Sequence, residues 1–169
     1  MSDEQESGSK NIDIQGMVRE FHKAFGHPAP DEPTVVRKKR LLDRADYQQS
    51  EIVELYEALD MNDVAGVMDA IGDDVYFAMG TFVELGVDFY EVFRRIHASN
   101  MSKLWPNSNE AIASWLEQGY EGLTLEDVNF IPTADPALVI VQHGATGKVL
   151  KGPNFAPPDL ADLVPVKSD

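Results

Sequence analysis

Apolar side chains recur every three or four residues from residue 14 to residue 104, which is the spacing of amphipathic helices. The first such segment covers residues 14–25 and ends at Gly26. The same spacing predicts three further helices, over about residues 34–59, 64–85 and 88–104, joined by short turns. Four helices with short connections indicate a helical bundle whose middle two helices form an antiparallel hairpin.

The pattern changes after Trp105 and Pro106. The pattern of residues 109–117 predicts a short helix. A glycine-containing turn, flanked by residues 137–142 and 148–150, is typical of a β-hairpin. The predicted fold class is all-α, a four-to-five-helix bundle with a small C-terminal β-hairpin. We expect three parts, namely a disordered leader at residues 1–10, the helical bundle at residues 11–106, and a C-terminal extension at residues 107–169 with the short helix, the hairpin and a tail.

Each helix of the predicted hairpin has one purely apolar face. We expect these two faces to be core faces of the bundle. They consist of Ile52, Leu55, Tyr56 and Leu59 on the first helix and of Val64, Ile71, Val75 and Ala78 on the second.

Pairs of carboxylates mark a second face on each of these helices, among aromatic and small residues. The pairs are Glu51 and Glu54 on the first helix, and Asp69 and Asp73 on the second. Carboxylates buried without positive partners cost several kcal/mol each. These pairs therefore favour a bound Mg²⁺ ion, which prefers oxygen ligands. The alternative is an ordinary solvated acidic face.

Polar residues that suit phosphate lie on two of the same helices. Asn100 and Lys103 extend the apolar stripe of the fourth helix, and Lys is a competent point-charge partner for phosphate. Arg40 begins the stripe that carries Glu51 and Glu54, and it is a third candidate for substrate binding. The alternative for Lys103 is a favourable charge near a helix C-terminus.

The charge balance excludes some classes of function. The chain has 29 acidic and 14 basic residues and a formal net charge of -15, so it does not suit binding to a nucleic-acid duplex. It has no cysteine, which excludes disulfides and thiol catalysis. No apolar run approaches the roughly 20 residues of a membrane span, and the polar N-terminal residues are unlike a targeting peptide. We expect a cytoplasmic protein.

The motifs Glu51-Ile-Val-Glu54, Asp69-Ala-Ile-Gly-Asp73 and Ser99-Asn-Met-Ser-Lys103, in this order, resemble the MazG-like, all-α nucleoside triphosphate pyrophosphohydrolases. That superfamily includes phosphoribosyl-ATP pyrophosphohydrolases and the dimeric dUTPases. The resemblance covers about residues 14–104. Residues 147–155 also look like the tail of phage-type and bacterial relatives.

The resemblance implies a Mg²⁺ enzyme, with Mn²⁺ as a substitute, that cleaves a nucleoside triphosphate between its α and β phosphates. It implies a homodimer or homotetramer, carboxylate ligands at Glu51, Glu54 and Asp73, and Asn100 and Lys103 near the phosphates. Asp69, on the same helix face as Asp73, is our candidate for the fourth ligand. Glu51 is our candidate for the catalytic base. Two positions depart from the family pattern, because Ser50 and Ala70 stand where relatives carry glutamate.

Two other classes of function stay open. A non-catalytic module that binds a nucleotide or a metal is consistent with Ser50 and Ala70. A structural helical oligomer with an acidic partner interface is the second. The sequence has no Walker-type GxxxxGK[ST] motif, so a P-loop enzyme is not supported.

Overall fold

The computed structural model describes residues 12–165, which divide into two compact units. The first unit runs to Phe89 and also takes in the residues from Ala161 onward, and the second runs from Tyr90 to Leu160. The expected leader at residues 1–10 lies outside the described residues.

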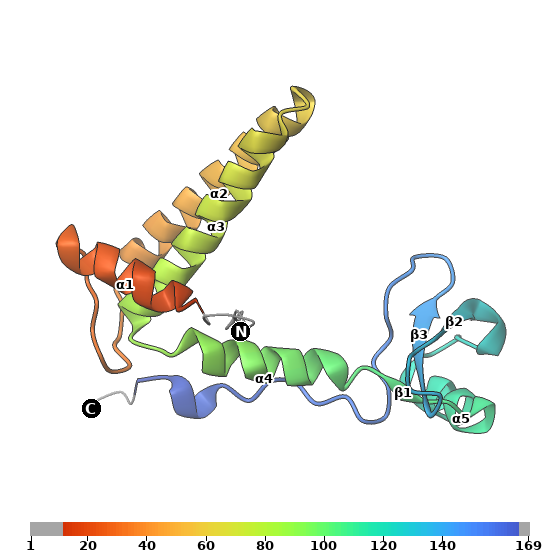
Figure 1. The fold of residues 1–169 in the computed structure, drawn as a ribbon. Coiled ribbons are helices and arrows are strands. Elements are labelled where there is room, and N and C mark those ends of the chain that lie inside the picture. The colour runs from red at the N-terminus through yellow and green to blue at the C-terminus, as the bar shows by residue number, and fades with distance from the viewer. Residues whose placement is uncertain (1–11, 166–169) are drawn as a thin grey trace, which may run out of the picture. The chain divides into compact units, whose positions relative to one another are not determined.

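Between residues 12 and 89 the first unit contains three α-helices (Figure 1). They are α1 (Ile14–Ala24), α2 (Lys38–Asp60) and α3 (Val64–Leu85), and the 3₁₀ turn η2 (Ala161–Leu163) also belongs to this unit. The long helices α2 and α3 pair as an antiparallel hairpin, and α1 packs on α3. Asp63 begins α3 as an N-cap, because its carboxylate accepts a hydrogen bond from the Ala65 N–H at 3.0 Å.

The ends of the hairpin have clear local causes. Asn62 turns the chain between α2 and α3 with a φ of 54°, and Gly86 ends α3 with a φ of 66°. A Cβ atom at Gly86 would collide with the Glu32 carbonyl, so glycine is required there. The expected start of α2 at residue 34 is wrong, since the Thr34 N–H donates to the Leu85 carbonyl at 2.8 Å and so stays outside the helix.

The inner face of the α2–α3 hairpin is not the apolar face that the periodicity predicts. Ile52, Tyr56 and Ile71 are 41%, 66% and 51% exposed, whereas Ala58 and Ala70 are buried. Small residues allow the two helices to approach closely, since a Cβ atom at Gly66 would lie 3.0 Å from the Ala58 Cβ. Of the predicted core faces only Leu55 and Ala78 are half-buried, and an apolar surface of this hairpin is exposed.

The second unit combines two α-helices, a small sheet and a C-terminal segment (Figure 1). Its helical elements are α4 (Phe89–Met101), α5 (Asn109–Gly119) and the 3₁₀ turn η1 (Leu125–Asp127). The first residue of α4, Phe89, is still counted in the first unit. Its strands are β1 (Trp105–Pro106), β2 (Val128–Pro132) and β3 (Leu138–His143). They form an antiparallel sheet in the order β1-β3-β2, with Trp105 opposite Val139 and Phe130 opposite Val141.

The core of the second unit lies between this sheet and α5. Trp105 is completely buried, and its indole N–H donates to the Leu150 carbonyl at 3.1 Å. The other buried residues of this core are Ile112, Leu116, Val128, Val139, Val141 and Leu150.

The structure confirms a mainly helical fold with a small β element near the C-terminus. The main partner of β3 is β2, while the expected strand at residues 148–150 contributes one bridge, between Gln142 and Val149. Strand β2 is short, mostly exposed and ends in a proline, so it lacks the alternating pattern that predicts a strand. Within residues 12–165 no helix has the length and apolar character needed to span a membrane.

Candidate metal and nucleotide site

The predicted carboxylate pairs lie on the two helices of the α2–α3 hairpin. Glu51 and Glu54 are on α2, and Asp69 and Asp73 are on α3. Glu51 is buried, with 8% of its surface exposed, and the other three are exposed. One carboxylate therefore lies inside the hairpin and three lie on its surface.

The charges of the other three carboxylates act on the pKa of Glu51. Burial raises the pKa of the Glu51 carboxyl, and the negative charges of Glu54, Asp73 and Asp69 raise this pKa further. These influences all act in the same direction. The structure thus brings the four predicted ligands into one electrostatic neighbourhood.

A fifth carboxylate, Asp74, joins this group and was missed by the sequence reasoning. It is half-buried, accepts a hydrogen bond from the Gln48 side chain at 3.1 Å, and also raises the pKa of Glu51. A signal for it exists in the sequence, because Ala70, Asp74 and Phe77 are spaced four and three residues apart, as on one helix face. Together Glu51, Glu54, Asp69, Asp73 and Asp74 form what we call the acidic cluster.

The two departures from the family pattern have different surroundings. The Ser50 hydroxyl is exposed and donates to the Tyr47 carbonyl of its own helix at 2.6 Å. Ala70 is buried, with 3% of its surface exposed, so this inward position of α3 carries no carboxylate. The inward carboxylate at this part of the hairpin is Glu51 on α2.

The donor set of the acidic cluster fits a hard divalent cation. It offers carboxylate oxygens, which Mg²⁺ prefers over nitrogen or sulfur. Across residues 12–165 no three carboxylate or imidazole groups already converge closely enough to hold a metal. Like charges favour such separation, and Glu54, Asp69 and Asp73 are exposed side chains that change rotamer freely. Binding an ion would require these three side chains to turn toward Glu51.

Arg40 lies in a different environment, toward the other end of the hairpin. Its guanidinium makes a two-pronged ion pair with Glu84, with N···O distances of 2.8 and 2.6 Å. Arg44 donates to the same carboxylate at 2.9 Å and also to the Phe77 carbonyl at 2.6 Å. Arg40 therefore already has a carboxylate partner. Its binding of phosphate stays a prediction.

Glu84 and His22 complete this second group, which we call the arginine cluster: Arg40, Arg44, Glu84 and His22. Burial alone would raise the pKa of Glu84, but the hydrogen bond from Arg40 and the charge of Arg44 outweigh it and lower the pKa. Burial lowers the pKa of His22, whose Nδ1 lies 2.8 Å from the Pro28 carbonyl oxygen. A neutral His22 that donates from Nδ1 satisfies both observations.

An aromatic group lies next to the acidic cluster. The rings of Phe21 and Phe25 stack with centroids 4.3 Å apart, and Tyr76 meets Phe21 edge to face at 5.7 Å. Burial raises the pKa of Tyr76, and the charges of Glu20 and Asp73 raise it further. Phe25 is 68% exposed, so its ring is accessible to solvent.

In the second unit, Asn100 and Lys103 contact each other. The Lys103 ammonium donates to the Asn100 side-chain oxygen at 2.7 Å, at and just beyond the end of α4. The amide holds the ammonium in place without neutralising its charge. This arrangement suits an anionic ligand.

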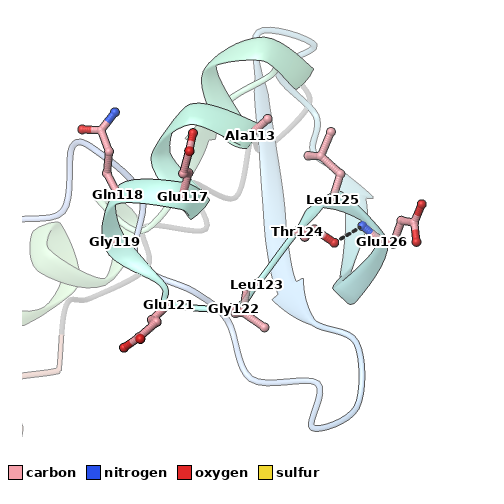
Figure 2. A pocket seen from close by; sticks show the side chains of 10 residues that line it. All are labelled: Ala113, Glu117, Gln118, Gly119, Glu121, Gly122, Leu123, Thr124, Leu125 and Glu126. Atoms are coloured by element: carbon pink, nitrogen blue, oxygen red, sulfur yellow. Dashed lines mark hydrogen bonds between the residues drawn. The ribbon is translucent and has the colours of Figure 1, made fainter.

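A cavity of about 960 Å³ between α5 and η1 has the wrong charge for a nucleotide site (Figure 2). Its charged lining residues are Glu117, Glu121 and Glu126. The backbone of Glu126 donates to the Thr124 hydroxyl at 3.3 Å, which forms the turn drawn in Figure 2. Three glutamates would repel phosphate groups.

Residues 18–100, which include the helices α2 and α3, match the family model of phosphoribosyl-ATP pyrophosphohydrolase, a member of the MazG-like nucleoside triphosphate pyrophosphohydrolase superfamily. An uncharacterized protein of Acanthamoeba polyphaga mimivirus is 27% identical over 166 residues. The match covers 91% of this chain and 64% of the length of the viral protein.

Proposed function

We propose that this protein is a Mg²⁺-dependent nucleoside triphosphate pyrophosphohydrolase that releases a nucleoside monophosphate and pyrophosphate. The observation that carries this proposal is Glu51, a buried carboxylate whose pKa is raised by burial and by four surrounding carboxylates. Such a group is costly without a cation beside it. The family match over residues 18–100 supports hydrolysis of a phosphate anhydride.

The chain's residues divide into three roles in this proposal. Glu54, Asp69 and Asp73 hold the ion together with Glu51, and Mn²⁺ can replace Mg²⁺. A bound ion supplies charge neutralisation at the phosphates and lowers the pKa of a water molecule. Glu51 is the candidate base, because a carboxylate oxygen that is not engaged with the ion can accept the proton of the attacking water. Asn100 and Lys103 contact phosphate oxygens, with Arg40 as a third candidate.

The aromatic group beside the carboxylates supports a nucleotide over a simple polyphosphate. Phe21, Phe25 and Tyr76 offer ring surfaces on which a base can stack, and Tyr76 is close enough to Asp73 to feel its charge. Hydrolysis of a nucleoside triphosphate should therefore be favoured over hydrolysis of inorganic triphosphate at equal concentration.

The outward apolar surface of the α2–α3 hairpin supports a homodimer or homotetramer. Large apolar residues on both helices are more than 40% exposed, including Ile52, Tyr56, Ile71 and Val75. Monomeric proteins rarely expose contiguous apolar patches of this kind. We propose that a second copy of this chain covers it. Light scattering that returned 18.7 kDa at micromolar concentration would contradict this proposal.

The test of the proposed reaction is product analysis. A panel of nucleoside triphosphates is incubated with the protein and Mg²⁺, Mn²⁺ or a chelator in ¹⁸O-labelled water. We expect pyrophosphate and a monophosphate with either metal and no products with the chelator. Label in the monophosphate would indicate attack at the α phosphorus, and label in pyrophosphate attack at the β phosphorus. Orthophosphate with a nucleoside diphosphate would contradict the proposal.

A non-catalytic binding module is the second candidate function. It is favoured by Ser50 and Ala70, which replace glutamates of the family pattern. Tight binding of Mg²⁺ and nucleotide without turnover of any member of the panel would establish this module in place of the enzyme.

A further inference from the structure

Residues 150–156 form an irregular segment of the second unit whose backbone is held by several side chains. The Trp105 indole donates to the Leu150 carbonyl at 3.1 Å. The Tyr120 hydroxyl accepts from the Lys151 N–H at 2.7 Å and donates to the Lys151 carbonyl at 3.1 Å. Gly152 is buried, and a Cβ atom there would lie 3.0–3.2 Å from the Trp105 ring. The backbone around Lys151 is thus fixed on both sides.

This fixed segment presents the Lys151 ammonium in a defined position. The ammonium lies 4.2 Å from the centroid of the Phe155 ring, which is a cation–π contact. Within residues 12–165 Lys151 makes no ion pair, although acidic residues outnumber basic ones 29 to 14 in the chain. Lys151 therefore carries an oriented positive charge that no carboxylate neutralises.

The segment is also tied to the end of α4, where Lys103 lies. The Ala156 N–H donates to the Ser102 hydroxyl at 3.0 Å, so the residues next to Lys103 and Phe155 touch. Lys103, like Lys151, is held by a neutral side chain, through its bond to Asn100. Lys103 and Lys151, whose charges no carboxylate of the described residues neutralises, thus lie on two segments that are joined by a hydrogen bond.

The other basic side chains of this unit differ from these two lysines. Arg94 and Arg95 both pair with Glu91, so a carboxylate offsets their charge. Lys148 is exposed, and none of the hydrogen bonds, ion pairs or ring contacts found holds its ammonium. Orientation together with an unneutralised charge distinguishes Lys103 and Lys151.

We propose that Lys151 is a second phosphate-binding lysine, which acts with Lys103 in the second unit on a pyrophosphate group. This inference rests on the proposed function. An ammonium that is held in place by an aromatic ring loses less freedom when it binds an anion, and Lys binds phosphate as a point charge. Phe155 acts as a positioning residue for Lys151.

The experiment uses inorganic pyrophosphate as the probe for binding and the preferred nucleoside triphosphate for kinetics, both with the full chain and Mg²⁺. Lys151→Gln should raise the Kd for pyrophosphate about tenfold or more, the loss expected for one charge-assisted contact. Lys148→Gln, which removes a neighbouring exposed lysine, is the matched control and should change the Kd less than about twofold. Lys151→Arg should recover most of the affinity because it restores the charge.

Phe155→Leu provides an independent variant, because it keeps an apolar side chain and removes the ring. It should weaken pyrophosphate binding by a smaller factor than Lys151→Gln, about threefold. Its melting temperature separates loss of the cation–π contact from loss of the fold. An unchanged Kd in folded Phe155→Leu protein would contradict the role of the ring.

The outcomes separate this inference from the proposed function. If the protein turns over nucleotide and Lys151→Gln matches Lys148→Gln, the inference is overturned and the hydrolase stands. If both variants weaken binding equally, the effect is general charge and the site is again overturned. If Lys151→Gln selectively weakens pyrophosphate binding but no nucleotide is hydrolysed, the anion site stands and the hydrolase function falls. If the protein binds no pyrophosphate and hydrolyses no nucleotide, both fall.

Discussion

Two buried glutamates of the α2–α3 hairpin, Glu84 and Glu51, have opposite surroundings. Glu84 is 1% exposed and is paired with Arg40 and Arg44, which hold its pKa below the ordinary value against the effect of burial. Glu51 is 8% exposed, and both burial and four neighbouring carboxylates raise its pKa. The same kind of residue thus faces positive partners in the arginine cluster and like charges in the acidic cluster.

The difference separates a structural cluster from the one that we propose to be functional. Removing one partner of a buried ion pair leaves an uncompensated charge, so the arginine cluster stabilises the hairpin only as a complete set. The acidic cluster has no arginine or lysine among the groups that shift the pKa of Glu51. A cation from solution can supply the missing charge, which couples ligand binding to the stability of the hairpin.

The largest effect on stability should come from the arginine cluster. Glu84→Gln leaves Arg44 buried without its carboxylate, and we expect the free energy of unfolding to fall by about 3–5 kcal/mol. Denaturant titration measures this change. Asp43→Asn breaks the more exposed pair with Lys39 and should change the free energy of unfolding far less, because solvent screens a surface pair. Equal effects of the two variants would remove the distinction between the arginine cluster and an ordinary surface pair.

The contribution of Glu84 should also depend on pH in a defined direction. Because its pKa is lowered in the folded state, its stabilisation is present above the reference value of 4.5 and is lost as the pH falls through the folded-state pKa. The difference in unfolding free energy between the unmodified protein and Glu84→Gln should therefore shrink below about pH 4.5. A difference that grows on acidification would contradict this assignment.

Substitutions in the acidic cluster should have their largest effect on the rate of nucleotide hydrolysis. Asp73→Asn and Glu54→Gln each remove one metal ligand, and we expect kcat/KM to drop at least about a hundredfold, since even outer-shell changes cost 10–100-fold. Steady-state kinetics with saturating Mg²⁺ measures this loss. Glu57→Gln removes a nearby exposed carboxylate of α2 and should leave kcat/KM within about threefold. A drop of the same size in the control would mean that general negative charge is what matters.

The two clusters were not equally predictable from sequence. Glu51, Glu54, Asp69 and Asp73 belong to short motifs with helical spacing, so neighbours in the chain define them. Glu84 and Arg44 are 40 residues apart, and their pairing depends on the register of α2 against α3. Periodicity shows which faces of a helix are apolar but not what covers each face.

The same limit explains two errors. Ile52 and Ile71 were expected on core faces of the bundle and are exposed, while the small residues Ala58 and Ala70 are buried. Strand β2 was not predicted, because its register with β3 is set by long-range pairing and its own residues are mostly exposed. The helices themselves were predicted well, since their caps and turns depend on local residues such as Asp63 and Gly86.

The smallest expected effect is a change in the melting temperature caused by Glu51→Gln. It tests the contrast between the two clusters most directly. Because the pKa of Glu51 is raised, its charged form destabilises the folded protein above that pKa, and Glu51→Gln removes this penalty. In chelator at neutral pH, Glu51→Gln should melt about 2–4 °C higher than the unmodified protein, which corresponds to on the order of 1 kcal/mol. At pH 4, near the reference value of 4.5, this gain should be largely lost.

The decisive measurement is the same pair of melting curves with millimolar Mg²⁺. The ion should stabilise the unmodified protein by mass action and should have little effect on Glu51→Gln, which lacks one ligand. The order of the two melting temperatures should therefore reverse between chelator and Mg²⁺. If the unmodified protein melts at the same temperature in both buffers, and the order of the two proteins does not change, the acidic cluster does not bind the ion and the account is wrong.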